Sequence, residues 1–145
     1  MNRIATVDAL NRRNIGVGSS ACGLCEEDEE SVEHLFTSCY FASMLWTLIS
    51  NWCKCLPMVV FSFRGLIEIH NHVGLDGKKK KVLKGLVRIG CWSIWKMRNN
   101  ARFENKEVKL EYIFGEVKKI GFLWFKSRNK NVETTWVDWC KFVNL

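Results

Sequence analysis

The sequence predicts a mostly α-helical fold, and three observations favour it. The chain has one proline, Pro57, and two tyrosines among 145 residues, which leaves few of the turns that a many-stranded sheet needs. Its seven tryptophans supply a large apolar area, because each one buries on the order of 150–250 Å². Two long stretches in the carboxy-terminal half carry apolar residues at helical spacing. We therefore expect helices packed around a tryptophan-rich core.

The first elements are predicted to be short. Thr6 is a suitable N-cap for a short helix, and the glycines at 16 and 18 would end it. Residues 22–25 are typical of a tight turn, and the acidic stretch 26–30 is typical of a solvated loop. The beginning of the chain is thus expected to be one short helix followed by irregular structure.

A second group of elements precedes the middle of the chain. Ser31 can cap a helix that runs through His34, and residues 41–52 carry apolar side chains at helical spacing up to the segment that contains Pro57. The apolar run 58–63 fits a strand and a helix equally well. The spacing leaves that choice open.

The carboxy-terminal half contains the strongest helical periodicity. Apolar residues recur on one face of a helix predicted over 78–103 and of a second helix predicted over about 108–128. Residues 129–131 break the second helix, and Thr134 or Thr135 would cap a last short one. These elements predict a small bundle with two long helices, residues 54–145, on which residues 1–53 pack as a separate module or as part of one continuous domain.

Charge is distributed unevenly along the chain. The formal net charge is +7, but residues 1–53 hold three basic and seven acidic side chains, whereas residues 54–145 hold nineteen basic and eight acidic ones. The carboxy-terminal part is therefore the one that could meet a polyanion. The longest uncharged run, 35–53, approaches the length of a membrane span but contains many polar residues. We interpret it as a helix buried in the protein and expect no membrane partner.

Four residues have the spacing of a metal site. Cys22, Cys25, His34 and Cys39 form the pattern C-x2-C-x8-H-x4-C, which supplies three thiolates and an imidazole. Zinc binds four such ligands in a tetrahedron. Chance spacing of two core cysteines and a surface histidine is the alternative. The pattern predicts a Zn²⁺ site, and the acidic residues beside it make a structural role more fitting than phosphate binding.

The other cysteines and histidines predict no second metal site. Two alternating pairs lie in the middle of the chain: Cys53 and Cys55, and His70 and His72. We expect Cys53 to be an apolar residue of the core and the two histidines to lie in a loop, so that these four residues bind no metal. Cys91 and Cys140 are expected to be core thiols. The amino terminus shows no secretory signal, and we expect reduced thiols in an intracellular protein, nuclear or cytoplasmic and not secreted.

These residues resemble the zinc-binding region of plant non-LTR retrotransposon reverse transcriptases. The resemblance rests on the following segments: Ile4-Ala5-Thr6-x-Asp8-x-Leu10 with Arg13, Cys22-x-Leu24-Cys25, Glu30-Ser31-Val32-Glu33-His34-Leu35-Phe36-x-x-Cys39, Phe41-Ala42 and Leu45-Trp46. Downstream, Trp92-x-Ile94-Trp95-Lys96-x-Arg98-Asn99 with Phe103 is similar to a segment that commonly follows it. The chain has Glu26 and Tyr40 where the family usually has glycine and proline. These departures alter turns and no ligand.

The resemblance implies a non-catalytic part of a retroelement protein. No Tyr/Phe-x-Asp-Asp polymerase signature occurs in the sequence, so the implied role is a zinc-binding accessory domain of an RNA-directed DNA polymerase. Its implied partners are RNA or DNA and the polymerase region of the retroelement protein. A module that docks on the polymerase through aromatic surfaces is the alternative. An enzyme in its own right is disfavoured, because four protein ligands leave the zinc no open position.

One face of the first long helix is the predicted nucleic-acid surface. At 100° per residue, seven basic and aromatic residues share about a third of the circumference: Lys81, Lys84, Arg88, Trp92, Trp95, Arg98 and Arg102. Cations neutralise phosphates, and an indole between them can stack on an unpaired base. The alternative is that the two tryptophans are packed inside the protein and the cations are only solvated.

Overall fold

The computed structural model describes residues 4–12, 19–104 and 107–145, and it is mostly helical as predicted. Within these ranges the only strand-like pairing is one antiparallel bridge between Ala21 and Glu29. The elements in chain order are α1 (Val7–Arg12), the π-helical turn η1 (His34–Ser38), α2 (Tyr40–Cys53), α3 (Phe63–Glu68), the 3₁₀ turn η2 (Ile69–Asn71), α4 (Gly77–Phe103), α5 (Leu110–Arg128) and α6 (Trp136–Lys141). None of the described helices is long and apolar enough to cross a membrane.

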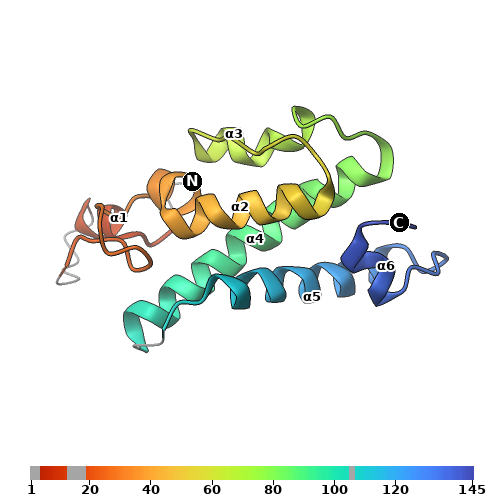
Figure 1. Cartoon of the computed structure of the whole chain (residues 1–145). Coiled ribbons are helices and arrows are strands. Elements are labelled where there is room, and N and C mark those ends of the chain that lie inside the picture. Colours follow the sequence, from red (N-terminus) through yellow and green to blue (C-terminus); the bar gives the residue numbers. More distant parts are fainter. Residues whose placement is uncertain (1–3, 13–18, 105–106) are drawn as a thin grey trace.

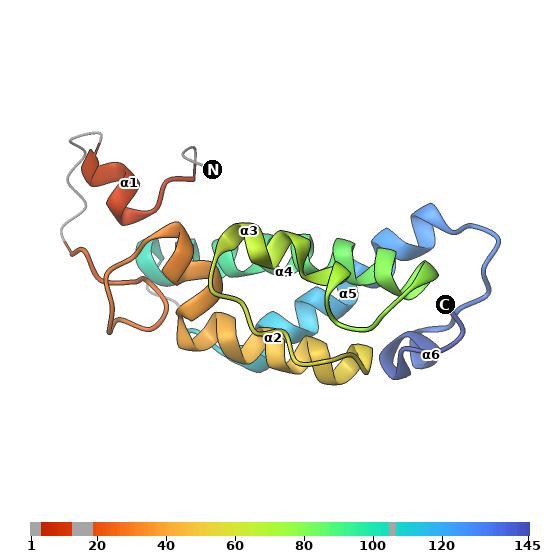
Figure 2. The same cartoon turned by 90° about the horizontal axis from the view of Figure 1, so that it is seen from above.

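Helix α4 is the longest described helix and runs through the middle of the bundle (Figure 1). It packs along α5, and α2 lies against both of them. Helix α3 and η2 cover another side of α4 (Figure 2). The amino-terminal segment with α1 lies at one end of this elongated bundle and α6 lies at the other. The two ends of the molecule are therefore built from different parts of the chain.

Glycines let the helices of the bundle approach closely. A Cβ atom at Gly90 in α4 would stand 2.7 Å from the ring of Trp46 in α2. A Cβ atom at Gly85, one and a half turns earlier, would collide with the ring of Trp124 in α5. Both indoles thus lie directly on the α4 backbone, which is possible because glycine has no side chain.

One core runs through the bundle. Its buried side chains come from both sides of residue 53, and Trp52 at the end of α2 contacts Phe114, Trp139 and Phe142 from the carboxy-terminal half. The indole of Trp52 also donates a hydrogen bond of 3.0 Å to the carbonyl of Trp139. Residues 1–53 and 54–145 therefore share buried surface.

The two long helices and the caps follow the sequence prediction. Helix α4 begins at Gly77, within one residue of the predicted start, and Thr135 caps α6 by accepting a hydrogen bond from the Asp138 amide. Helix α2 ends at Cys53, and its C-cap Lys54 adopts a left-handed conformation with φ 54°, shortly before the predicted end of the element near Pro57. Capping chemistry accounts for the start of α6, whereas apolar periodicity predicted the extent of α4, whose N-cap Asp76 makes no side-chain capping hydrogen bond.

The apolar run 58–63 is neither a strand nor a helix over most of its length. It stays irregular until Ser62, whose side chain accepts a hydrogen bond from the Gly65 amide and starts α3. Met58 and Leu66 are buried on the bundle, whereas Phe61 is 89% exposed. Tertiary packing determines the conformation of this segment, because a short apolar run is compatible with both helix and strand and favours neither.

Candidate metal centre

The first two predicted ligands lie in a small hairpin loop. The Cys22 amide donates to the carbonyl of Asp28 at 2.7 Å, next to the Ala21–Glu29 bridge, and the Glu26 amide donates to the carbonyl of Cys22 at 3.0 Å. The turn requires a left-handed residue, and Glu26 supplies it with φ 60°. This conformation is costly for a residue with a side chain. Glu26 stands where the resembling family usually has glycine, so this departure adds backbone strain to the turn.

The other two ligands are joined by a wide helical turn. The Cys39 amide donates to the carbonyl of His34 at 2.7 Å, five residues back, which is the hydrogen bond of a π-turn. Ser31 caps this turn as predicted, since its hydroxyl accepts from the His34 amide at 3.0 Å. The four-residue gap between His34 and Cys39 thus corresponds to one π-turn, which brings both ligands to the same side.

The four donor atoms converge. The three cysteine sulfurs and one ring nitrogen of His34 all lie within 4.8 Å of one another. The Sγ atoms of Cys22 and Cys39 are 3.9 Å apart, and the Sγ atom of Cys25 lies 3.3 Å from Nε2 of His34. A tetrahedral zinc ion requires about 3.8 Å between two sulfurs and about 3.5 Å between sulfur and nitrogen. The donor set and its spacing therefore fit zinc.

The second ring nitrogen of His34 faces polar groups on the outer side of the site. Its Nδ1 atom lies 3.3 Å from the Ser38 hydroxyl and 4.0 Å from a carboxylate oxygen of Asp28. Such partners fix the tautomer of a metal-binding histidine, because Nδ1 keeps the proton while Nε2 stays free to bind.

The site also favours ionised sulfur. The side-chain hydrogen bond from Cys39 lowers the pKa of Cys22 from 9.0 to about 5, although burial opposes this shift. The backbone amide of Leu24 points at the same sulfur at 3.5 Å. The paired Cys22 sulfur and burial together raise the pKa of Cys39. One thiolate is thus stabilised before any cation arrives, and a metal ion would deprotonate the other thiols.

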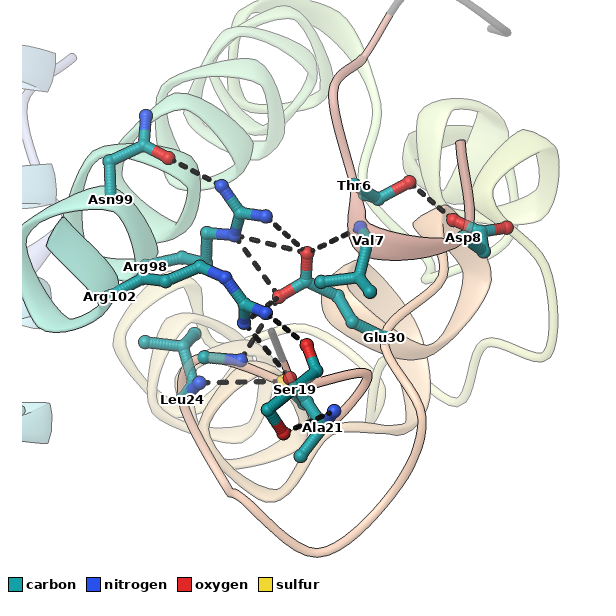
Figure 3. A network of polar contacts seen from close by, with 12 residues as sticks. Thr6, Val7, Asp8, Ser19, Ala21, Leu24, Glu30, Arg98, Asn99 and Arg102 are labelled. Carbon is teal, nitrogen blue, oxygen red and sulfur yellow. Dashed lines mark hydrogen bonds and ion pairs between the residues drawn. The ribbon is translucent and has the colours of Figure 1, made fainter. Parts of the chain in front are cut away.

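A buried ion pair joins the loop that carries Cys22 and Cys25, residues 19–33 and here called the metal loop, to α4 (Figure 3). The Glu30 carboxylate is fully buried and accepts hydrogen bonds from the amides of Val7 (2.9 Å) and Gly23 (3.0 Å) and from Nε of Arg98 (3.1 Å). Arg102 approaches the same carboxylate at 3.8 Å. One acidic side chain thereby joins α1, the metal loop and the last turns of α4.

The surroundings of Glu30 favour its ionised form. Burial alone would raise the pKa of Glu30, but hydrogen bonds from Arg98 and from the amides of Gly23 and Val7 hold it below its usual 4.5. Since the folded pKa is lower than the unfolded one, this contribution to stability is fully present above about pH 4.5. It is lost as the pH falls through the lowered pKa.

Arg98 and Arg102 bind Glu30 and backbone carbonyls of the amino-terminal segment. Arg98 is 1% exposed, and its guanidinium also donates to the carbonyl of Ala5 at 3.3 Å and lies 4.8 Å from the Trp95 ring centroid. Arg102 donates to the carbonyls of Ala21 and Ser19. The prediction of Arg98 as a phosphate contact is wrong in this structure, because its charge is neutralised by Glu30 inside the protein.

The remaining residues of the predicted surface differ in exposure. Lys81, Lys84 and Arg88 are exposed on the first half of α4, Trp92 is 52% exposed and Trp95 is half-buried. The Nζ atom of Lys96 lies 5.2 Å from the centroid of the Trp92 ring. The structure therefore keeps three cations and one indole of the seven predicted residues on the surface, whereas Trp95 and Arg102 are half-buried and Arg98 is buried.

The cysteines and histidines outside the four-donor cluster range from buried to half-exposed. Cys53 and Cys91 are buried, and burial raises the pKa of Cys91 to about 12 and that of Cys53 further. Cys140 is half-buried rather than in the core. His70 lies in η2, where burial and nearby cations lower its pKa.

The comparisons with known proteins point to the same residues. Residues 1–46 match the family model zf-RVT, zinc-binding in reverse transcriptase. This match covers about a third of the chain, includes all four donors and confirms the resemblance of that region. No curated protein and no solved structure matches the chain. The zf-RVT region thus ends within α2, and the segment around Arg98 lies beyond it.

Proposed function

We propose that the chain is a non-catalytic zinc-binding accessory region of a retrotransposon reverse transcriptase, itself an RNA-directed DNA polymerase. The observation that carries this proposal is the convergence of Cys22, Cys25, His34 and Cys39 within 4.8 Å, inside the segment that matches zf-RVT. The matched region is a zinc-binding region and includes no polymerase region. Ligation needs free thiols, so the proposal includes a reducing location in the nucleus or cytoplasm.

The proposed role of the zinc is structural. Four protein donors complete a tetrahedron, so no position remains for a catalytic water. The bound ion would cross-link a loop that has few apolar side chains of its own. Cys22 and Cys25 hold the hairpin, while His34 and Cys39 hold the π-turn and the start of α2. The metal thereby holds the Gly23 amide in position to donate its hydrogen bond to the Glu30 carboxylate.

Zinc content tests this proposal directly. Protein purified without added metal is expected to contain one zinc ion per chain, and the Co²⁺-substituted protein is expected to show the absorption of tetrahedral thiolate coordination. Cys39→Ser should abolish both signals. Cys140→Ser is the matched control, because it removes a half-buried thiol outside the site. Zinc-free wild-type protein, or equal zinc in both variants, would contradict the proposal.

We further propose that the basic part of α4 contacts RNA or DNA. The support is the exposure of Lys81, Lys84 and Arg88 on one helix of a chain with net charge +7. Each phosphate that they neutralise would release counterions and make binding depend on salt. Replacing Lys84 and Arg88 with Gln should reduce the slope of log affinity against log salt by about 1.4 for a single strand. An unchanged slope would assign these charges to solubility.

Docking on the polymerase region is a second candidate function. It is favoured by a hollow of about 380 Å³ whose lining is mainly apolar and includes Ile4, Phe36, Phe63 and Trp92. Such a patch is typical of a protein contact. Trp92→Glu should then weaken binding of a separately expressed polymerase region at least tenfold and leave zinc content unchanged. If that region does not bind the wild-type chain, this candidate fails.

A further inference from the structure

A hollow of about 400 Å³ lies between the first turns of α4 and the last turn of α5. Its volume is in the range of small-molecule sites. The residues that matter here are Lys78, Lys81, Val82, Trp124, Phe125 and Arg128. Val82 and Phe125 are buried, whereas the three cations are exposed. The hollow therefore has an apolar base and a basic rim, and it is separate from the metal centre.

Helix spacing and one glycine create this arrangement. Lys78, Lys81 and Gly85 lie on one face of α4, since they are three and four residues apart. The absence of a side chain at Gly85 admits the ring of Trp124 from α5 against the α4 backbone. Trp124 stays half-buried and lines the hollow. The indole is thus held in place by packing and still borders the open space.

The charges at the hollow are available to a ligand. Within the described ranges no carboxylate forms an ion pair with Lys78, Lys81 or Arg128. The guanidinium of Arg128 lies 5.8 Å from the centroid of the Trp124 ring. A cation and an indole side by side offer both a partner for phosphate and flat surfaces for a base.

We propose that this hollow binds one unpaired nucleotide of an RNA or DNA strand. The inference rests on the proposed nucleic-acid function and gives it a defined subsite. Lys78, Lys81 and Arg128 contact the phosphates on either side, and the base stacks against Trp124 with Arg128 beside it. A paired base is held in its duplex stack and cannot stack on a ring that lines a hollow, so the ligand is single-stranded.

The first test measures affinity for oligo-dT and oligo-U of about ten nucleotides, with the full chain loaded with zinc. Trp124→Leu should weaken binding about 5- to 150-fold, which corresponds to loss of one stacked base at 1–3 kcal/mol, while the salt slope stays the same. Trp124→Phe should recover part of the affinity, because a smaller ring still stacks. Tyr112→Leu is the control, because it removes an exposed ring at the other end of α5, and it should leave the affinity within twofold of the wild type.

The second test concerns the phosphate contacts and holds even if Trp124 variants unfold. The triple variant Lys78→Gln, Lys81→Gln and Arg128→Gln should lower the salt slope by about 2. The control triple Arg12→Gln, Arg64→Gln and Lys109→Gln removes the same net charge from exposed sites elsewhere and should change the slope by less than half as much.

The outcomes separate the subsite from the wider proposal. A wild-type chain that binds both strands, with Trp124→Leu unchanged and both triple variants equivalent, would overturn the subsite and leave nucleic-acid binding in place. A wild-type chain that binds neither strand would overturn both. Poly-glutamate that binds with the same dependence on Trp124 and on the first triple variant would show an acidic peptide site instead.

Discussion

The two ends of the molecule are held together by different interactions. At the end with α1 and the metal loop, the buried groups include the Glu30 carboxylate, the Arg98 guanidinium and three of the four candidate metal ligands, Cys22, His34 and Cys39. At the end with α6, Trp139 packs against the rings of Trp52 and Phe125, with centroids 5.3 and 5.2 Å apart. The first end depends on polar partners and the second on apolar area.

This difference indicates which end of the molecule would depend on a bound metal ion. A charged pair in the interior stabilises little by itself and is costly when one partner is lost. Aromatic burial needs no second partner of opposite charge, no particular pH and no metal ion. Helix α2 joins the two ends: Trp46 donates a hydrogen bond to the carbonyl of Phe36 near the metal, and Trp52 lies in the aromatic cluster. We therefore expect loss of order to spread from the metal loop only part of the way into α2.

The largest expected effect comes from removing the metal. Chelation, or Cys39→Ser, should abolish amide-exchange protection of residues 20–38, because structural zinc in small finger peptides contributes roughly 10–16 kcal/mol of apparent binding free energy. Protection in α4, α5 and the second half of α2 should persist. Hydrogen exchange measured by mass spectrometry with and without chelator tests this. Unchanged exchange of residues 20–38 would show that this segment is ordered without zinc. Global unfolding would show that the end with α6 also depends on the metal.

Breaking the buried ion pair should have the next largest effect. Arg98→Met leaves the buried Glu30 carboxylate without its hydrogen-bonded cation, with only Arg102 at 3.8 Å, and should lower the free energy of unfolding by about 3–5 kcal/mol at pH 7. Zinc affinity should fall as well, since Gly23 in the metal loop donates to the same carboxylate. Chemical denaturation and competition with a zinc chelator measure the two effects.

The double variant Glu30→Gln, Arg98→Met is the control for this prediction. It removes both charges and should recover at least half of the lost stability. A double variant as unstable as Arg98→Met would show that packing of the Arg98 side chain against Trp95, rather than its charge, is what matters.

A smaller effect is expected at the aromatic end. Trp139 is fully buried, and its indole donates to the carbonyl of Lys118 at 2.9 Å. Trp139→Leu should lower the free energy of unfolding by about 2–3 kcal/mol, because Leu refills part of the volume. Zinc affinity should stay within twofold of the wild type. A tenfold loss of zinc affinity would contradict the independence of the two ends.

The smallest effect is a gain in stability at Glu26. Its left-handed conformation costs about 1–2 kcal/mol, and Glu26→Gly would remove that cost at the expense of about 0.5–1 kcal/mol of backbone entropy. We expect a net gain of up to about 1 kcal/mol in zinc-loaded protein, measured by thermal denaturation. Glu27→Gly is the control, because its neighbouring position has no positive φ, and it should destabilise slightly. Equal effects of both would refute strain at Glu26.

The sequence by itself determined the helical class, the boundaries of the long helices and the four donors of the metal site. The reason is that these features are local. Helical periodicity, a capping Ser31 and the gaps within C-x2-C and H-x4-C act over a few residues, so their outcome is visible in the order of the residues. The π-turn between His34 and Cys39 shows this, since its hydrogen bond spans the same gap that defines the motif.

Only the tertiary structure decided which charges and indoles remain free. Arg98 lies on the same helical face as Lys84 and Arg88, yet it is buried because Glu30, 68 residues away in the chain, supplies its counter-charge. Glu30 was one of a run of acidic residues, and nothing in that run distinguishes it from its solvated neighbours. Trp124 likewise became part of a basic hollow through a glycine on another helix. Pairing over such distances depends on how helices pack, and helix packing is not encoded in the local spacing of residues.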